Sequence, residues 1–392
     1  MRQVVEFSWN SLSKAGEELC GDSVIIRSSR ESFVAVLSDG LGSGVKASIL
    51  STLTAEIAAR LFESGLTVEE VMNTIIETLP ECDVRKLAYA TFAVLIVKDG
   101  RHAHLVEFDS PPLIVIRDKA IFDLKTVERE VRERKIREAR FELQENDYLV
   151  MVSDGYDHAG LGGMYRFGWG RKNIAVAVQR FVQTGVDTYK LMQALSKICM
   201  KLYDDKPGDD STVIAMKVRP AESVIILTGP PANKELDAFA VSRLTSAEGH
   251  KIICGGSTAQ MAARVLEQEL EVEWVPPWRR TEEKKSPRKG SPPTALLKGV
   301  DLVTEGILTL GQAIEVMRGV HSVDDLPKDQ DAATRLARYL IAADDIHFVV
   351  GTAINPNQVA DLIRGEPMRM VYIRELVQEL QQRNKQVTLE RI

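Results

Sequence analysis

The stretch FVAVLSDG at residues 33–40 ends an apolar run with Ser-Asp-Gly, and YLVMVSDG at residues 148–155 repeats that ending. Short apolar runs bounded by turn residues are typical of buried β-strands. Each stretch therefore predicts a strand with an aspartate at its end, Asp39 in the first and Asp154 in the second. Taken singly, each aspartate is explained as a turn former, because its side chain bonds the backbone that follows.

Further aspartates extend this pattern. Asp22 lies in an early Cys-Gly-Asp segment, and Asp209 and Asp210 open a third apolar run, DDSTVIAMKV. Carboxylates at the ends of several central strands can converge on one edge of a sheet, where they would repel one another unless a cation neutralised them. An all-oxygen ligand set suits Mg²⁺ or Mn²⁺. Two such ions roughly 3.5–4 Å apart can lower the pKa of a bridging water and neutralise charge on a phosphoryl group.

The first 220 or so residues group their strands and their helices. A β-hairpin is predicted for residues 90–108, because Asp99-Gly100 separates two apolar runs and Asp-Gly favours a tight hairpin turn. Residues 128–140 are dense in both charge signs and fit either a solvated helix or an exposed hairpin. The grouping of like elements indicates an α+β fold, a β-sandwich flanked by helices.

A long amphipathic helix is predicted for residues 43–63. Its apolar face is expected to contain the large aliphatic residues that recur at intervals of four, with Leu50 and Ala58 alongside them; the recurring residues are Val45, Ile49, Leu53, Ile57 and Leu61. Further helices are expected over residues 68–79, 174–181 and 189–203.

Two breaks in composition divide the chain. The first lies near residues 219–221, and the second is PPWRRTEEKKSPRKGSPP, residues 276–293, with five prolines and six basic residues. The second break predicts a solvated loop or linker, with contact to an acidic partner as the alternative. Strands and helices alternate beyond residue 221, which predicts an α/β domain with a mainly parallel sheet over residues 221–392. The first domain then takes residues 1–220.

A glycine-rich loop in the second domain is a candidate anion site. Gly255, Gly256, Ser257 and Thr258 follow a predicted strand and open a helix, so free N–H groups and two hydroxyls lie together at the carboxyl edge of the sheet. The alternative is structural, with the glycines forming a turn and Ser257 capping the helix. The loop matches neither the P-loop nor the GxGxxG pattern.

Four short motifs of the first domain occur in a fixed order: GD at residues 21–22, DGLGSG at 39–44, SDG at 153–155 and GDDST at 208–212. This set resembles the metal-dependent PP2C phosphatases and, more narrowly, their bacterial branch of sporulation stage II protein E. SPPLIVIRD at 110–118 and FELQENDYLVMVSDG at 141–155 are similar to segments of that branch. The resemblance covers about residues 1–220 and implies an antiparallel β-sandwich with helices on both faces, in α/β/β/α layers.

The resemblance also implies a role for each motif residue. Asp39 would bridge two divalent ions, Mn²⁺ or Mg²⁺, with the carbonyl of Gly40 on one of them. Asp22 would hold the first ion, directly or through water. Asp154 and Asp209 would bind the second ion.

Several positions depart from the family's pattern. Asp210 replaces an asparagine of many relatives and would support the ligands. Leu41 stands where eukaryotic relatives carry a histidine that acts as general acid, which lowers the expected rate but not the type of reaction. The phosphate-holding arginine has no clear counterpart, and Arg27 and Lys46 are candidates by position only.

The implied reaction is hydrolysis of phosphoserine or phosphothreonine on a partner protein by metal-activated water. The second domain would be a regulatory or ligand-binding module for a small molecule. Two alternatives stay open: a catalytically silent scaffold whose loop 255–258 binds a phosphorylated ligand, and a hydrolase of small phosphate esters.

Composition excludes other classes of protein. A formal charge of −6 lacks the basic field of a nucleic-acid binder. No apolar run approaches the ~18 residues of a membrane span, and the N-terminus lacks the continuous apolar segment of a signal peptide. Four scattered cysteines without a CxxC pair indicate reduced thiols. The composition predicts a cytoplasmic protein without nucleic-acid or membrane partners, and the resemblance implies that it is a bacterial signalling enzyme.

Overall fold

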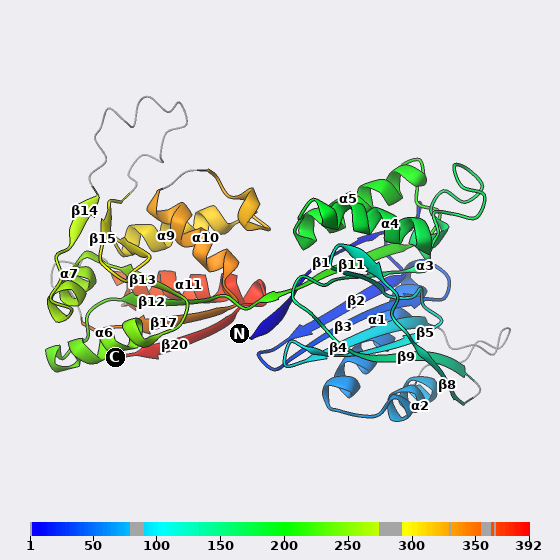
Figure 1. Ribbon diagram of the computed structural model, residues 1–392, viewed down its shortest axis with the longest axis horizontal. Coiled ribbons are helices and arrows are strands. Elements are labelled where there is room, and N and C mark those ends of the chain that lie inside the picture. The colour runs from blue at the N-terminus through cyan, green and yellow to red at the C-terminus, as the bar shows by residue number, and fades with distance from the viewer. Residues whose placement is uncertain are drawn as a thin grey trace. The chain divides into compact units, whose positions relative to one another are not determined.

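The computed structural model describes residues 2–78, 90–132, 134–273, 292–328, 331–353, 362–363 and 366–392. The chain divides into two compact units, Met1–Pro220 and Ala221–Ile392, and each is described by itself (Figure 1). Nearly all of the predicted proline-rich loop at 276–293 lies outside the described residues.

The first unit contains two sheets in which every strand pairing is antiparallel. One sheet has the order β1-β11-β10-β6-β7. Its strands are β1 (Gln3–Leu12), β6 (Ile114–Arg117), β7 (Ala120–Phe122), β10 (Tyr148–Val152) and β11 (Ser211–Pro220). The other sheet has the order β2-β3-β4-β5-β9-β8. Its strands are β2 (Asp22–Ser28), β3 (Ser32–Gly40), β4 (Ala90–Lys98), β5 (His102–Phe108), β8 (Val127–Val131) and β9 (Arg134–Glu142).

Two hairpins of the second of these sheets bear on the sequence analysis. The predicted hairpin is confirmed, since β4 pairs with β5 and the turn residues Asp99 and Gly100 have φ values of 53° and 65°. Positive φ at both positions is what a two-residue turn of this kind requires. The charged segment 128–140, left open between helix and hairpin, forms the hairpin of β8 and β9.

Apolar residues of both sheets pack against each other and form a core between them. Along β3 the side chains alternate, because successive residues of a strand point to opposite faces. Ala35 and Leu37 enter the core between the sheets, while Val34 and Val36 pack with α1 (Gly44–Glu63) and α2 (Val68–Thr78). The sheet of β1, β10 and β11 packs with α3 (Asp154–His158), α4 (Arg171–Gln183) and α5 (Thr188–Leu202) (Figure 1).

Helix α1 has the predicted length, but three residues of its predicted apolar face are exposed. Val45, Ile49 and Leu53 are 61%, 55% and 46% exposed. Leu50 and Ala58 of the predicted face are buried as expected, and small residues such as Ala47, Ser51 and Ala55 are buried beside them. The helix approaches the sheet closely: a Cβ added to Gly40 would lie 2.1 Å from the carbonyl oxygen of Ala47. Large aliphatic side chains do not fit at that separation.

The second unit contains a mixed sheet of order β14-β15-β16-β13-β12-β17-β20. Five neighbouring strands are parallel, which agrees with the prediction from alternating elements: β16 (Leu302–Thr304), β13 (His250–Cys254), β12 (Ser223–Thr228), β17 (Asp345–Val350) and β20 (Gln386–Arg391). The edge strands β14 (Glu271–Glu273) and β15 (Thr294–Leu296) are antiparallel. A short antiparallel pair, β18 (Leu362–Ile363) and β19 (Glu366–Pro367), lies apart from this sheet.

Helices cover both faces of the mixed sheet. One face packs with α9 (Ile307–Met317), α10 (Ala332–Ala342) and α11 (Met368–Gln382), and the other with α6 (Asp237–Ser246) and α7 (Gly256–Val265). Among the residues that the structure describes, no helix combines the length and the hydropathy that crossing a bilayer requires.

Candidate metal centre

The predicted aspartates come together at one end of the first unit. The antiparallel register of β2 and β3 places Asp22 directly opposite Asp39. Asp154 begins α3 immediately after β10, and Asp209 precedes β11, the neighbour of β10 in the sheet. Two hydrogen bonds tie these strand ends together, because Ser153 N donates to Thr212 O at 3.0 Å and Thr212 N donates to Ser153 Oγ at 2.8 Å.

Asp22 is a buried carboxylate whose charge no described cation or hydrogen-bond donor compensates. It is 6% exposed, and neither of its carboxylate oxygens has a hydrogen-bond partner among the described residues. Burial raises the pKa of Asp22, and the charges of Asp210 and Asp154 raise it further, against the nearby hydroxyls of Ser153 and Thr212, which lower it. The carboxylate is therefore left to carry its charge at a free-energy cost.

Asp39 lies in the same electrostatic environment. Burial raises its pKa most, followed by the charges of Asp22 and Asp154 and by a hydrogen bond with Asp154 that favours the protonated form. The next residue, Gly40, donates its N–H to Gly21 O at 3.1 Å. Because any side chain at Gly40 would collide with the backbone of α1, this position accepts only glycine.

Asp154 and Asp209 form the more exposed half of the cluster, with side chains that are 48% and 41% exposed. Burial and the charge of Asp154 raise the pKa of Asp209, while Lys14, whose Nζ lies 4.0 Å from Asp209 Oδ1, lowers it. One potential ligand atom each of Asp154, His158 and Asp209 lies within 4.8 Å of the others. Sequence analysis missed His158, although its spacing of four from Asp154 on a helix was a signal for a shared face.

Asp210 lies behind the cluster. It is 4% exposed, its Oδ1 accepts from Lys14 N at 3.0 Å, and its Oδ2 has no hydrogen-bond partner among the described residues. A Cβ added to Gly21 would lie 2.7 Å from that Oδ2, so the side chain packs against the backbone beside Asp22. The supporting role expected for Asp210 stays a prediction.

The positions that depart from the family's pattern lie as follows. Leu41 is 41% exposed and has no proton to donate. Arg27 forms ion pairs with Glu56 at 2.8 Å and Glu63 at 3.1 Å, both on α1, so its charge is already engaged. Lys46 is exposed on α1.

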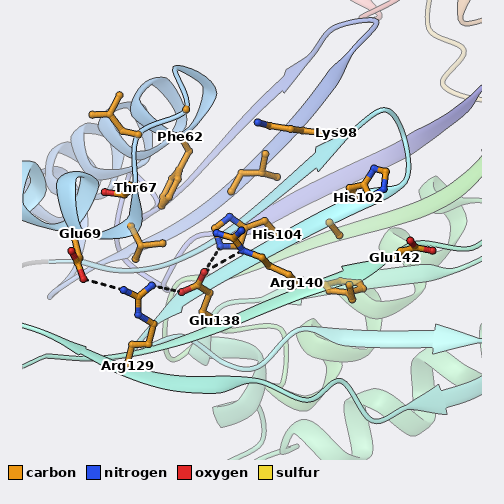
Figure 2. Close-up of a pocket in the computed structure, with 16 residues that line it drawn as sticks. Phe62, Thr67, Glu69, Lys98, His102, His104, Arg129, Glu138, Arg140 and Glu142 are labelled. Atoms are coloured by element: carbon orange, nitrogen blue, oxygen red, sulfur yellow. Dashed lines mark hydrogen bonds and ion pairs between the residues drawn. The ribbon is translucent and has the colours of Figure 1, made fainter.

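A cavity of about 680 Å³ lies elsewhere in the first unit (Figure 2). It includes Ile96 and Lys98 at the far end of β4, whereas Asp39 pairs with Thr91 at the start of that strand. Its charges are matched. Glu138 lies 2.8 Å from His104 Nε2 and accepts from Arg129 at 2.9 Å, as Figure 2 shows.

His104 is bonded to Glu138, and His102 is exposed at the rim, so a metal held by the two is not supported. The carboxylate cluster, with its excess of one charge sign, is the better candidate for chemistry.

In the second unit, the glycine-rich loop is largely accounted for by structure. Thr258 is buried and its Oγ1 accepts from Gly229 N at 2.9 Å, which ties the loop after β12 to the start of α7. Gly255, with φ of 134°, is the N-cap residue of α7 and has no side chain to cap it. Ser257 is therefore not the cap, contrary to the structural alternative. Gly256 and Ser257 are exposed.

Comparison with known proteins found matches to the first unit. The family model described as Stage II sporulation protein E (SpoIIE) matches residues 29–219. No curated protein matches the chain. One similar solved structure contains the PP2C phosphatase domain and a fragment of the regulatory domain of SpoIIE from Bacillus subtilis. It is 19% identical with a TM-score of 0.46, and the match covers 56% of this chain and 64% of that one, less than two thirds of its length.

Two further structures are similar at the same level. The RsbU and RsbW domains of a Mycobacterium tuberculosis protein are 15% identical with a TM-score of 0.46, covering 61% of this chain and 68% of that one. The catalytic domain of the serine/threonine phosphatase PstP, solved with two manganese ions, is 15% identical with a TM-score of 0.39, covering 56% of this chain and all of that one. By the family match and the ordered aspartate motifs, residues 29–219 belong to the SpoIIE family of PP2C-type phosphatases.

Proposed function

We propose that the first unit is a metal-dependent phosphatase domain that removes phosphate from phosphoserine or phosphothreonine on a partner protein. The observation that carries this proposal is the convergence of Asp22, Asp39, Asp154 and Asp209. Burial and neighbouring charges raise the pKa values of Asp22, Asp39 and Asp209, and among the described residues neither oxygen of Asp22 has a hydrogen-bond partner. We include in the proposal that the two compact units are the two domains and that the first has α/β/β/α layers.

The donor set fits divalent cations of the hard type. All four aspartates offer carboxylate oxygens, and Asp22 keeps two buried oxygens without a donor. Such oxygens suit Mg²⁺ or Mn²⁺. When bound, a pair of these ions activates an attacking water and neutralises the charge that develops on the phosphoryl group.

The chain's own residues would divide the work as follows. Asp22 and Asp39, facing each other across β2 and β3, would hold one ion, with the Gly40 carbonyl beside them. Asp154 and Asp209 would hold the second ion, and Asp39 would reach both. Lys14 reduces the negative charge near Asp209 and so limits repulsion of an anionic phosphate.

A protein substrate is favoured by the openness of the site. Asp154 and Asp209 are about half exposed, so a phosphorylated loop can approach them without entering a closed pocket. No proton donor occupies the position of Leu41, and we expect turnover slower than in relatives with a histidine there. The second domain would regulate this activity by binding a small molecule or a partner.

The test is hydrolysis by the full chain with added Mn²⁺ or Mg²⁺. We expect release of phosphate from a phosphothreonine or phosphoserine peptide, complete loss in EDTA, and recovery when the metal returns. Faster turnover of small phosphate esters than of phosphopeptides would favour the small-ester hydrolase. Normal metal binding without any hydrolysis would favour the silent scaffold.

A further inference from the structure

We propose that His158 is a nitrogen ligand of the ion held by Asp154 and Asp209, so that this half of the site prefers Mn²⁺ to Mg²⁺. The inference rests on the proposed metal-dependent function and adds a ligand that the carboxylate pattern does not contain.

The first argument is the placement of His158 on α3. Residues four apart on a helix share a face, and Asp154 and His158 are the first and last residues of this helix. The distance from His158 Nδ1 to Asp154 Oδ2 is 4.0 Å. Two ligand atoms that each lie about 2.1 Å from one ion are at most about 4.2 Å apart.

Asp209 completes the group from a different element. One ligand atom of each of the three residues lies within 4.8 Å of the others. Three atoms that each lie about 2.1 Å from one ion can all be about 3.6 Å apart, so side-chain adjustments of about 1 Å bring all three to ligand spacing. Ligands from one helix face and from a neighbouring strand end approach an ion from different directions, as a coordination shell requires.

The backbone of His158 is held while its side chain is available. His158 O accepts from Leu161 N at 3.0 Å, and Asp157 O accepts from Gly170 N at 3.0 Å. The backbone of Gly168 lies so close that an added Cβ there would be 2.9 Å from His158 Cα. The imidazole is 52% exposed and, among the described residues, makes no hydrogen bond.

The competing explanation is an ordinary surface ion pair between His158 and Asp154. At 4.0 Å the contact is at the limit for such a pair. Asp154 also belongs to a cluster with an excess of negative charge, in which the buried oxygens of Asp22 lack partners. One exposed imidazole does not balance that excess, whereas a cation coordinated by it does.

The ligand type has a consequence for the metal. Carboxylate oxygens bind Mg²⁺ and Mn²⁺ alike, but imidazole nitrogen favours transition metals. The Asp154–His158–Asp209 half of the site should therefore select Mn²⁺, and the Asp22 half should discriminate less.

The experiment uses the full chain and Mn²⁺ itself. Pulsed EPR of bound Mn²⁺ should show modulation from a directly coordinated ¹⁴N nucleus in the wild type and in His102→Gln, which changes an exposed histidine on β5. His158→Gln and His158→Ala should lose the modulation. By calorimetry they should weaken one Mn²⁺ site about 10-fold and change Mg²⁺ affinity by less than about 3-fold.

Bound Mn²⁺ without nitrogen modulation in the wild type overturns the assignment of His158, and so does modulation that persists in His158→Gln. Neither result contradicts the proposed phosphatase activity, which the hydrolysis assay tests separately. Conversely, nitrogen modulation in a protein that releases no phosphate from any ester overturns the proposed function and leaves His158 as a ligand. A wild type that binds no Mn²⁺ contradicts both.

Discussion

The two units treat polar groups at the ends of their strands in opposite ways. Where β2 begins beside the end of β3, Asp22 is buried next to other carboxylates, and neither of its oxygens has a hydrogen-bond partner in the described part of the chain. At the end of β12 and β13, Thr258 is just as buried but accepts a hydrogen bond from Gly229 N, and Gly255 N donates to Thr304 O at 2.8 Å. An unpartnered buried charge destabilises a fold, whereas a bonded hydroxyl does not. We therefore take the unpaired buried charge of the first unit as a stronger indication of a binding site than the glycine-rich turn of the second.

The largest expected effect concerns catalysis. Asp39→Asn and Asp209→Asn should each lower kcat/KM with Mn²⁺ by about 1000-fold or more, because each removes a charged ligand from the reacting centre. Hydrolysis of p-nitrophenyl phosphate measures this. Asp99→Asn, at an exposed hairpin turn that accepts asparagine, is the matched control and should stay within about 2-fold of the wild type. Activity in Asp39→Asn close to that of the control would remove the cluster from the mechanism.

A metal-binding site should also stabilise the first unit. At a Mn²⁺ concentration 100 times the dissociation constant, the free energy of unfolding should rise by about 2.7 kcal/mol. For a unit of this size that corresponds to a rise in Tm of roughly 5–10 °C, measured by scanning calorimetry. Asp22→Asn should reduce the rise, and Thr258→Val should leave it unchanged. An equal rise in all three proteins would mean that Mn²⁺ binds outside the cluster.

Much of this site was accessible from the sequence, because aspartates at the ends of apolar runs are local signals. The strand ends that carry Asp39 and Asp154 are recognisable from a few residues, and their convergence follows from sheet topology. His158 was not recognised, since a lone histidine has meaning only once Asp209 is known to lie beside it. The role of Thr258 depends in the same way on Gly229, which is 29 residues away.

The buried face of α1 was predicted only in part, for a related reason. Two stripes run along this helix, one of large aliphatic residues that includes Val45 and Ile49, and one of small residues that includes Ala47 and Ala55. Hydrophobicity alone favours the first stripe. The second stripe faces the sheet because the helix lies too close to the sheet for large side chains there. The contact of Gly40 with the backbone of α1 sets that separation.

The charge cluster should make the metal-free protein sensitive to pH. The pKa of Asp39 is raised in the folded state, so between its ordinary value near 4 and the raised value the folded protein binds the proton more tightly than the unfolded chain. Stability from this group is therefore lost as pH rises through that window. In EDTA at pH 8, the free energy of unfolding of Asp39→Asn should be about 1–2 kcal/mol higher than that of the wild type. At pH 5 the difference should be smaller.

Urea denaturation followed by tryptophan fluorescence measures this difference, since Trp169 is buried in the first unit. Asp99→Asn should show no such gain, because its side chain is exposed. A metal-free Asp39→Asn protein that is less stable than the wild type at pH 8 would contradict the view that the cluster destabilises the empty site.

The smallest effects are expected in the loop of the second unit. Thr258→Val keeps the shape of the side chain but leaves Gly229 N without its acceptor, and it should lower the free energy of unfolding of this unit by about 1–2 kcal/mol. Ser257→Ala should change it by less than about 0.5 kcal/mol, because the hydroxyl is exposed and, within the described ranges, makes no hydrogen bond. Calorimetry of the full chain measures both, and the two variants should retain wild-type phosphatase activity. A different outcome would be that inorganic phosphate or a nucleotide stabilises this unit and that Ser257→Ala abolishes the stabilisation. The loop would then bind an anion through its exposed residues. In that case both units would bind a ligand at their strand ends, and the contrast between them would be smaller than proposed.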